Sequence, residues 1–145
     1  MVDFSQSINN ADMVAGLNHL IQMNASILAE LDQVSGLAKT ASHVQALKEM
    51  HGRHLECLGD TVCILGGGVK ERSWRRSLSE AKVTLAELGG NQSLTRSIAT
   101  EEQKLKAAYA RQRRRLNASP EAVRVINQIL SDRDAADGWV KSLSN

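Results

Sequence analysis

The sequence predicts an all-α fold: an up-down bundle of four long helices, with a short extra helix in the crossover between the second and the third. Three observations lead to this prediction. Apolar residues recur at helical spacing along most of the 145-residue chain. Aromatic residues make up only 3% of the sequence, fewer than a β-sandwich or β-barrel uses, and there is one proline. A chain of this length folds as one domain with its own core, so we assign residues 1–145 to a single domain.

The first two long helices are predicted from their apolar residues and from the glycines that follow them. The first covers about residues 11–35 and is followed by Gly36. The second covers about residues 40–65 and is followed by three consecutive glycines, 66–68. In both segments apolar side chains recur three or four residues apart, which places them on one face of an α-helix. Glycine just past the last periodic residue is typical of a helix end.

The second half of the chain predicts one short helix and two long ones. An apolar stretch at about residues 71–88 forms the extra helix of the crossover, and long helices follow at about 92–116 and 120–143. Ser119 before Pro120 is typical of a helix start. The serine side chain caps the first free amide groups, and proline fits the first turn.

Charge and cysteine content limit the classes of function. The 18 Lys and Arg against 16 Asp and Glu give a net charge of +2, too close to neutral to indicate a nucleic-acid-binding protein. The N-terminus lacks the basic and apolar regions of a signal peptide, and no stretch is apolar enough to cross a membrane. Cys57 and Cys63 lie too far apart along one helix for a disulfide. We therefore expect a cytoplasmic protein with no membrane partner.

Several polar side chains fall on the apolar faces of the predicted helices. Because buried polar groups need partners, we expect some of them to form a hydrogen-bonded network in the core. Arg133 and Asp137 are four residues apart on one helix and are expected to pair. The members of this candidate buried polar network are Asn24, His51, His54, Glu102, Arg133 and Asp137.

A metal site is the alternative interpretation of the same residues. Ferritin-like bundles hold two metals with a Glu from each of two helices and Glu-x-x-His from the other two. His51 and His54 could serve here with Glu102 or Asp137, but neither histidine has a Glu three residues before it. Residues 13–29 contain no carboxylate. We therefore favour a polar core, expect no metal and no cofactor, and keep a degenerate metal-binding protein as an alternative.

Two groups of arginines form a candidate basic patch. One group flanks Trp74 in the predicted short helix, and the other ends the third long helix. Arginines bind phosphate groups, but cations at the C-terminus of a helix also stabilise its dipole. We favour the dipole interpretation and keep weak nucleic-acid or anion binding through the second group as another alternative. The patch comprises Arg72, Arg75, Arg76, Arg111, Arg113, Arg114 and Arg115.

Six short motifs are spread over residues 14–143. In chain order they are Leu17-Asn-His-Leu-Ile21, Leu65-Gly-Gly67, Glu71-Arg-Ser-Trp74, Glu101-Glu102 with Tyr109, Pro120-Glu-Ala-Val-Arg124 and Asp134-Ala-Ala-Asp137. With these motifs the chain resembles an uncharacterised bacterial family of ferritin-like four-helix-bundle proteins, a domain-of-unknown-function family. The resemblance implies a helical bundle with a crossover helix, a bacterial source and no established activity.

From these features we expect a non-catalytic helical-bundle protein with a structural or protein-interaction role. No combination of serine, cysteine, histidine and carboxylate at catalytic spacing supports an enzyme. We expect a homo-oligomer, most simply a dimer, or binding to another protein. The aromatic side chains of Trp74, Tyr109 and Trp139 are the candidate contact surface.

Overall fold

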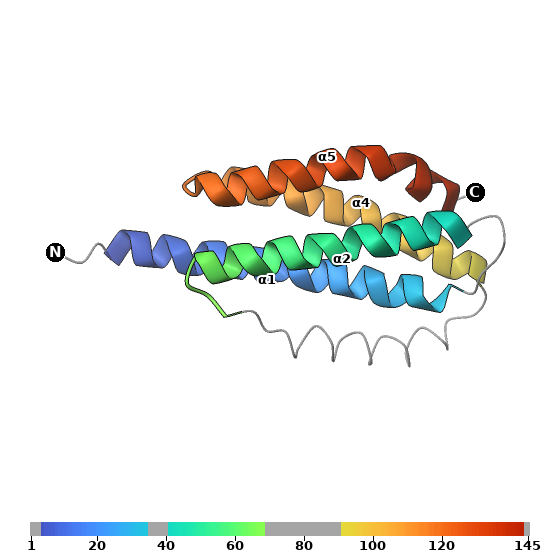
Figure 1. Cartoon of the computed structure of the whole chain (residues 1–145), viewed down its shortest axis with the longest axis horizontal. Coiled ribbons are helices and arrows are strands. Elements are labelled where there is room, and N and C mark those ends of the chain that lie inside the picture. The colour runs from blue at the N-terminus through green and yellow to red at the C-terminus, as the bar shows by residue number, and fades with distance from the viewer. Residues whose placement is uncertain (1–3, 35–40, 69–90, 144–145) are drawn as a thin grey trace.

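The computed structural model describes residues 4–34, 41–68 and 91–143, and these form an all-α bundle. Its four helices are α1 (Phe4–Gln33), α2 (Ala41–Ile64), α4 (Asn91–Arg115) and α5 (Pro120–Leu143) (Figure 1). Within the described ranges there is no strand. None of these helices combines the length and the apolar character that crossing a membrane requires.

The observed helix ends lie close to the predicted ones, with one exception. Helix α1 begins at Phe4, whereas the apolar pattern predicted a start near residue 11. Phe4, Ile8 and Ala11 do stand four and three residues apart, but all the residues between them are polar, so the prediction did not extend the helix to them. A helix that has already formed extends at low cost, because each added residue gains one hydrogen bond. The short helix predicted at 71–88 lies outside the described residues.

The end of α2 and the start of α5 are formed by the residues that the sequence predicted. The glycines after α2 end it: Gly66 has a φ of 83°, and its amide and that of Gly67 donate to the carbonyls of Cys63 and Val62 at 3.0 and 2.9 Å. This is a Schellman motif, which needs a left-handed residue that glycine adopts without strain. At the start of α5, the Ser119 hydroxyl accepts a hydrogen bond from the Ala122 amide at 3.2 Å.

The helices form a square in cross-section. Helix α1 packs against α2 and α4, and α5 packs against the same two helices, so α2 and α4 lie on one diagonal. All four neighbouring pairs are antiparallel. Asp32 near the end of α1 pairs with Lys48 early in α2 at 2.7 Å, and His43 at the start of α2 bonds Ser142 at the end of α5.

The four helices, taken in chain order, therefore do not alternate strictly in direction. Because α1 runs antiparallel to both α2 and α4, the latter two run in the same direction (Figure 1). Helix α2 ends at one end of the bundle and α4 begins at the other. The predicted up-down alternation holds for α1 with α2 and for α4 with α5, and not between α2 and α4.

Among the described residues, the fully buried apolar side chains are aliphatic apart from one aromatic ring. Tyr109 is fully buried near the middle of the core, among the side chains of all four helices. The largest fully buried apolar side chains include Leu17, Leu20, Ile27, Leu31, Leu47, Met50, Leu58, Ile98, Leu105, Leu116 and Ile126. Burial of such side chains stabilises the bundle by roughly 1.5–3 kcal/mol each. The polar residues described next are embedded in this core.

Candidate functional site: a buried polar network

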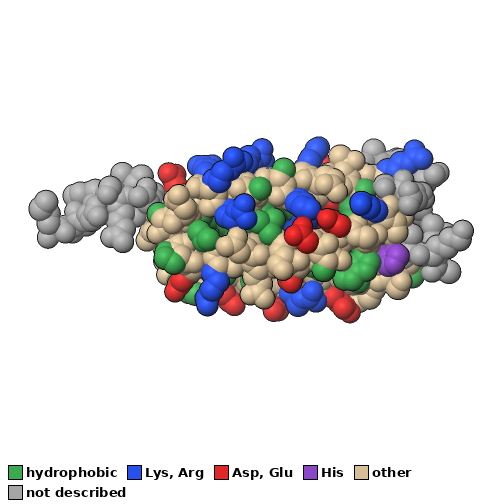
Figure 2. Space-filling model, turned by 90° about the horizontal axis from the view of Figure 1, so that it is seen from above, with side chains coloured by type: hydrophobic (Ala, Val, Ile, Leu, Met, Phe, Trp, Pro, Cys, Tyr) green, Lys and Arg blue, Asp and Glu red, His purple; other side chains and the backbone are tan. Residues whose placement is uncertain are grey.

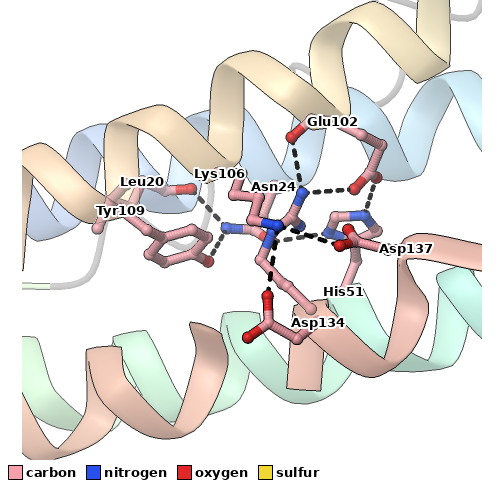
Figure 3. Close-up of polar contacts among 9 residues, drawn as sticks. Leu20, Asn24, His51, Glu102, Lys106, Tyr109, Asp134 and Asp137 are labelled. Atoms are coloured by element: carbon pink, nitrogen blue, oxygen red, sulfur yellow. Dashed lines mark hydrogen bonds and ion pairs between the residues drawn. The ribbon is translucent and has the colours of Figure 1, made fainter. Parts of the chain in front are cut away.

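The network begins with a buried amide on α1. Asn24 donates from Nδ2 to the carbonyl of Leu20 at 2.8 Å and to the hydroxyl of Tyr109 at 2.6 Å (Figure 3). Its Oδ1 lies 2.8 Å from Nδ1 of His51 on α2. Because the Leu20 carbonyl can only accept, the amide nitrogen must face it and the amide oxygen must face the histidine. His51 therefore carries a hydrogen on Nδ1 and donates it to Asn24.

His51 reaches across the bundle diagonal to α4. Its Nε2 is hydrogen-bonded to Oε1 of Glu102, and both side chains are almost completely buried (Figure 3). A ring nitrogen and a carboxylate oxygen are both acceptors without a proton, so a proton must lie between them. Nδ1 already carries its own hydrogen. The pair therefore holds one further proton, as an imidazolium beside a carboxylate or as a neutral imidazole beside a carboxylic acid.

Arg133 on α5 completes the network. Its Nη2 donates to Oε2 of Glu102 at 2.8 Å and to the Glu102 backbone carbonyl at 2.7 Å. Burial opposes ionisation of Glu102, but the hydrogen bond and charge of His51, together with Arg133, hold its pKa below the usual 4.5. The arrangement therefore favours the ionised carboxylate between two cations. Each of the four helices contributes one member: Asn24, His51, Glu102 and Arg133.

Tyr109 borders the network and is kept neutral. Burial raises the pKa of its hydroxyl well above the usual 10, and the Arg133 guanidinium lies 5.8 Å from the ring centre. A cation at this distance over a buried ring is attracted to its face. The expectation that Tyr109 belongs to a contact surface is wrong, because its side chain is 0% exposed. Trp139 is half-buried against the core, and Trp74 lies outside the described residues.

His54 lies beside the network without bonding to it. Its ring meets that of His51 edge to face at 6.5 Å, and its Nε2 lies 3.1 Å from Oδ2 of Asp132. Burial lowers the pKa of His54 to about 4, with the charges of His51 and Arg133 acting in the same direction and Asp132 opposing them. A neutral ring thus donates from Nε2 to Asp132. Its Nδ1 is buried with no hydrogen-bond partner.

The predicted pair of Arg133 and Asp137 does not form. Asp137 is 39% exposed and accepts from Lys106 at 3.1 Å, and Asp134 lies 3.3 Å from the same ammonium (Figure 3). Arg133 points inward to Glu102 instead, because that carboxylate is already buried and would otherwise lack a cation. Asp137 therefore belongs to a surface ion pair and not to the buried network.

One buried carboxylate on α1 was missed. Glu30 is only 8% exposed, and its Oε2 has no hydrogen-bond partner. Burial raises its pKa to about 7, and the charges of Glu101 and Glu102 add to the effect. The sequence did contain a signal, since Glu30 lies three residues after the buried Ile27 and therefore on the same helix face.

The candidate basic patch is described only in part. Arg111, Arg113, Arg114 and Arg115 are all exposed at the end of α4. Arg113 donates to the Asn127 side chain at 3.4 Å. Arg72, Arg75 and Arg76 lie outside the described residues.

The donor set of the core does not fit a metal ion. Within the described ranges, no group of three or more His, Cys, Asp and Glu side chains is arranged to hold one. Both carboxylate oxygens of Glu102 are engaged, one by His51 and the other by Arg133. A metal at Glu102 would have to displace the Arg133 guanidinium.

Comparison of the chain with models of protein families, with curated proteins and with solved structures finds no match. The resemblance to the ferritin-like family of unknown function stays a prediction from the sequence.

Proposed function

We propose that this chain is a non-catalytic helical-bundle module that acts through its surface, and that its buried polar network fixes how the helices pair. One observation carries the proposal. Glu102 is bonded to both His51 and Arg133, and the side chains of His51, Glu102 and Arg133 are 0%, 1% and 4% exposed. A catalytic acid or base must come within hydrogen-bond reach of its substrate. These three side chains are buried and bonded within the network, so they are not placed to exchange a proton with a substrate.

The network supports a role in specificity. Its bonds join one residue from each helix, so sliding any helix by one turn would separate a buried charge from its partner. A buried polar contact of this kind can select one register and reject others, although it adds little net stability. The same buried bonds therefore enclose the charged groups and select the helix register.

The direction of the helices supports a ferritin-like arrangement as part of the proposal. Ferritin-like bundles contain one long crossover connection. Helices α2 and α4, which run in the same direction, are consistent with such a connection. A dimer and a cytoplasmic location remain predictions from the sequence. A monomeric mass by sedimentation across the micromolar range would refute the dimer.

The first test distinguishes this function from metal binding. Tag-free protein is reconstituted anaerobically with ferrous, manganous or zinc ions, and its metal content and melting temperature are measured. We expect far less than one metal ion per chain and an unchanged melting temperature. A stoichiometry of at least one ion per chain that is lost in His51→Ala/His54→Ala would overturn the proposal in favour of a metal protein.

The second test addresses specificity. The triple variant His51→Leu/Glu102→Leu/Arg133→Met replaces the charged network by apolar side chains. We expect it to stay helical by circular dichroism, because replacing a buried set of charges as a whole by apolar side chains is often neutral or stabilising, and the remaining cost is that of the Asn24 oxygen, which loses its donor. We also expect its NMR spectrum to lose dispersion, since the apolar core no longer selects one helix register. A well-dispersed spectrum equal to that of the wild type would refute the role of the network in specificity.

A further inference from the structure

The outward face of α4 carries a line of cations along most of its length. At 100° per residue, Arg96, Lys104, Arg111, Arg114 and Arg115 fall within an arc of about 100°, and all five are exposed. We call these five residues the basic strip. The other exposed side chains between residues 96 and 111 are Ser97, Thr100, Gln103 and Ala107, which are neutral.

The helix dipole accounts for only part of the basic strip. Its effect is confined to the last turn of a helix, where Arg114 and Arg115 lie. Arg96 and Lys104 are several turns nearer the start of α4, where a cation gains nothing from the dipole. Lys104 has one acidic neighbour, Glu101 at 3.4 Å, in an exposed pair of the kind that contributes little. The strip is therefore a surface of positive potential that local helix stability does not explain.

Its dimensions suit a polyanion. The 20 residues from Arg96 to Arg115 span about 28 Å at 1.5 Å per residue. The five cations follow one another at intervals of about 12, 10, 5 and 1.5 Å along the axis. Duplex DNA carries one negative charge per 1.7 Å or so of its axis and presents grooves about 6 and 12 Å wide between its phosphate backbones. In Figure 2, Lys and Arg side chains gather along the upper edge of the face, toward the end where α4 meets α5.

The residues between the cations argue against other partners. A helix that lies on a membrane needs large apolar side chains beside its cations, and a protein interface needs an apolar or aromatic centre. The strip offers only small neutral side chains. Among the described residues, the large hydrophobic side chain with high exposure is Ile64, at 63%, on the diagonally opposite α2. Tyr109, the aromatic residue of α4, is buried, so the described part of the strip has no ring on which an unpaired base could stack.

We propose that the basic strip binds the phosphate backbone of a nucleic-acid duplex without reading its sequence. This inference rests on the proposed function, because it names the partner of the surface through which the module acts. Five phosphate contacts would make the logarithm of the association constant fall with the logarithm of salt concentration with a slope of about −4.5.

The test is fluorescence anisotropy of the full chain with a labelled duplex DNA of about 20 base pairs, of two unrelated sequences. We expect equal affinity for the two sequences and a loss of about 500-fold between roughly 50 and 200 mM salt. The strip variant is Arg111→Gln/Arg114→Gln; Arg115 is left in place because it lines a small cavity together with Asp12. With three phosphate contacts left, the affinity of this variant should fall only about 40-fold over the same range of salt concentration.

The control variant is Arg53→Gln/Lys141→Gln, which removes the same charge from exposed positions on α2 and α5. It should bind like the wild type, and both variants should keep the wild-type melting temperature. Equal weakening by both variants, absent or salt-insensitive binding, tighter binding to a single strand, or a preference for anionic vesicles would each overturn the proposal. If the duplex-binding test fails but the metal measurements above still find no metal, the nucleic-acid duplex is rejected as the partner and the proposed function stands.

Discussion

Replacing Glu30 by glutamine should change how the stability of the bundle depends on pH. The folded chain holds this carboxyl at a pKa of about 7, against 4.5 when unfolded, chiefly because it is buried. Between these values the folded state binds a proton that the unfolded state releases. The stability that Glu30 contributes is therefore complete below about pH 4.5 and is lost as the pH rises through 7. At 1.4 kcal/mol or so for each pKa unit, the loss amounts to about 3 kcal/mol.

His54 acts in the opposite direction over nearly the same range. Its pKa is about 4 in the folded chain and 6.5 when unfolded, so the stability it contributes is lost as the pH falls from 6.5 toward 4. Between about pH 4.5 and 6.5 the two effects cancel in the wild type. Glu30→Gln leaves the His54 effect alone, so the free energy of unfolding should rise by about 1.4 kcal/mol per pH unit. His54→Phe should show the reverse slope.

The assay is urea unfolding followed by circular dichroism at several pH values between 4.5 and 7. Glu56→Gln serves as the control, because Glu56 is an exposed carboxylate on α2 and its replacement should leave the wild-type profile unchanged. If the profile of Glu30→Gln runs parallel to that of the wild type, Glu30 titrates near its ordinary value in the folded chain. The argument from its burial would then be refuted.

Four further substitutions have expected effects on stability, each measurable by denaturant unfolding. His51→Leu leaves the Asn24 oxygen without its donor and removes one cation from Glu102, which should cost about 3–5 kcal/mol; a loss under about 1 kcal/mol would show that the network is not tightly formed. Gly66→Ala forces a left-handed backbone on alanine and should cost about 1–2 kcal/mol, whereas Gly138→Ala, within α5 and free of close neighbours, should stabilise by about 0.5–1 kcal/mol. Equal effects of the two would contradict the assigned φ of Gly66. Ser119→Ala removes the cap of α5 and should cost about 1 kcal/mol, and an unchanged stability would mean that water caps the helix equally well.

The helices were predictable because their signals are local. Apolar spacing fixed the course of each long helix, and the glycines from Gly66 and the Ser119 cap marked two ends that the hydrogen bonds reproduce. The start of α1 was missed although Phe4, Ile8 and Ala11 continue the helical spacing, because polar residues make up most of that segment and its apolar signal is weak. The relative direction of α2 and α4 depends on the chain between them and on packing, and no short window of sequence contains that information.

The site was predictable as a set of residues but not as a set of bonds. Asn24, His51 and Glu102 could be picked out because each lies on an apolar helix face, where a polar side chain must find a partner. The choice of partner depends on which helices are neighbours. The candidate partner of Arg133 in its own helix was Asp137, but Arg133 bonds to the carboxylate of Glu102 on α4. Tyr109 was misplaced although it lies four residues after Leu105 and seven before Leu116, on the apolar face of its helix, because its aromatic character was given more weight than its spacing.

The contribution of one residue by each helix to the network has a consequence for how the bundle unfolds. If any one helix detached, at least one charged or polar member would be left in the apolar core without its partner, and such a group costs several kcal/mol. An intermediate with three helices in place would therefore pay this penalty in addition to the packing that it loses. Loss of structure should be cooperative across the whole chain, with the calorimetric and van't Hoff enthalpies of unfolding equal.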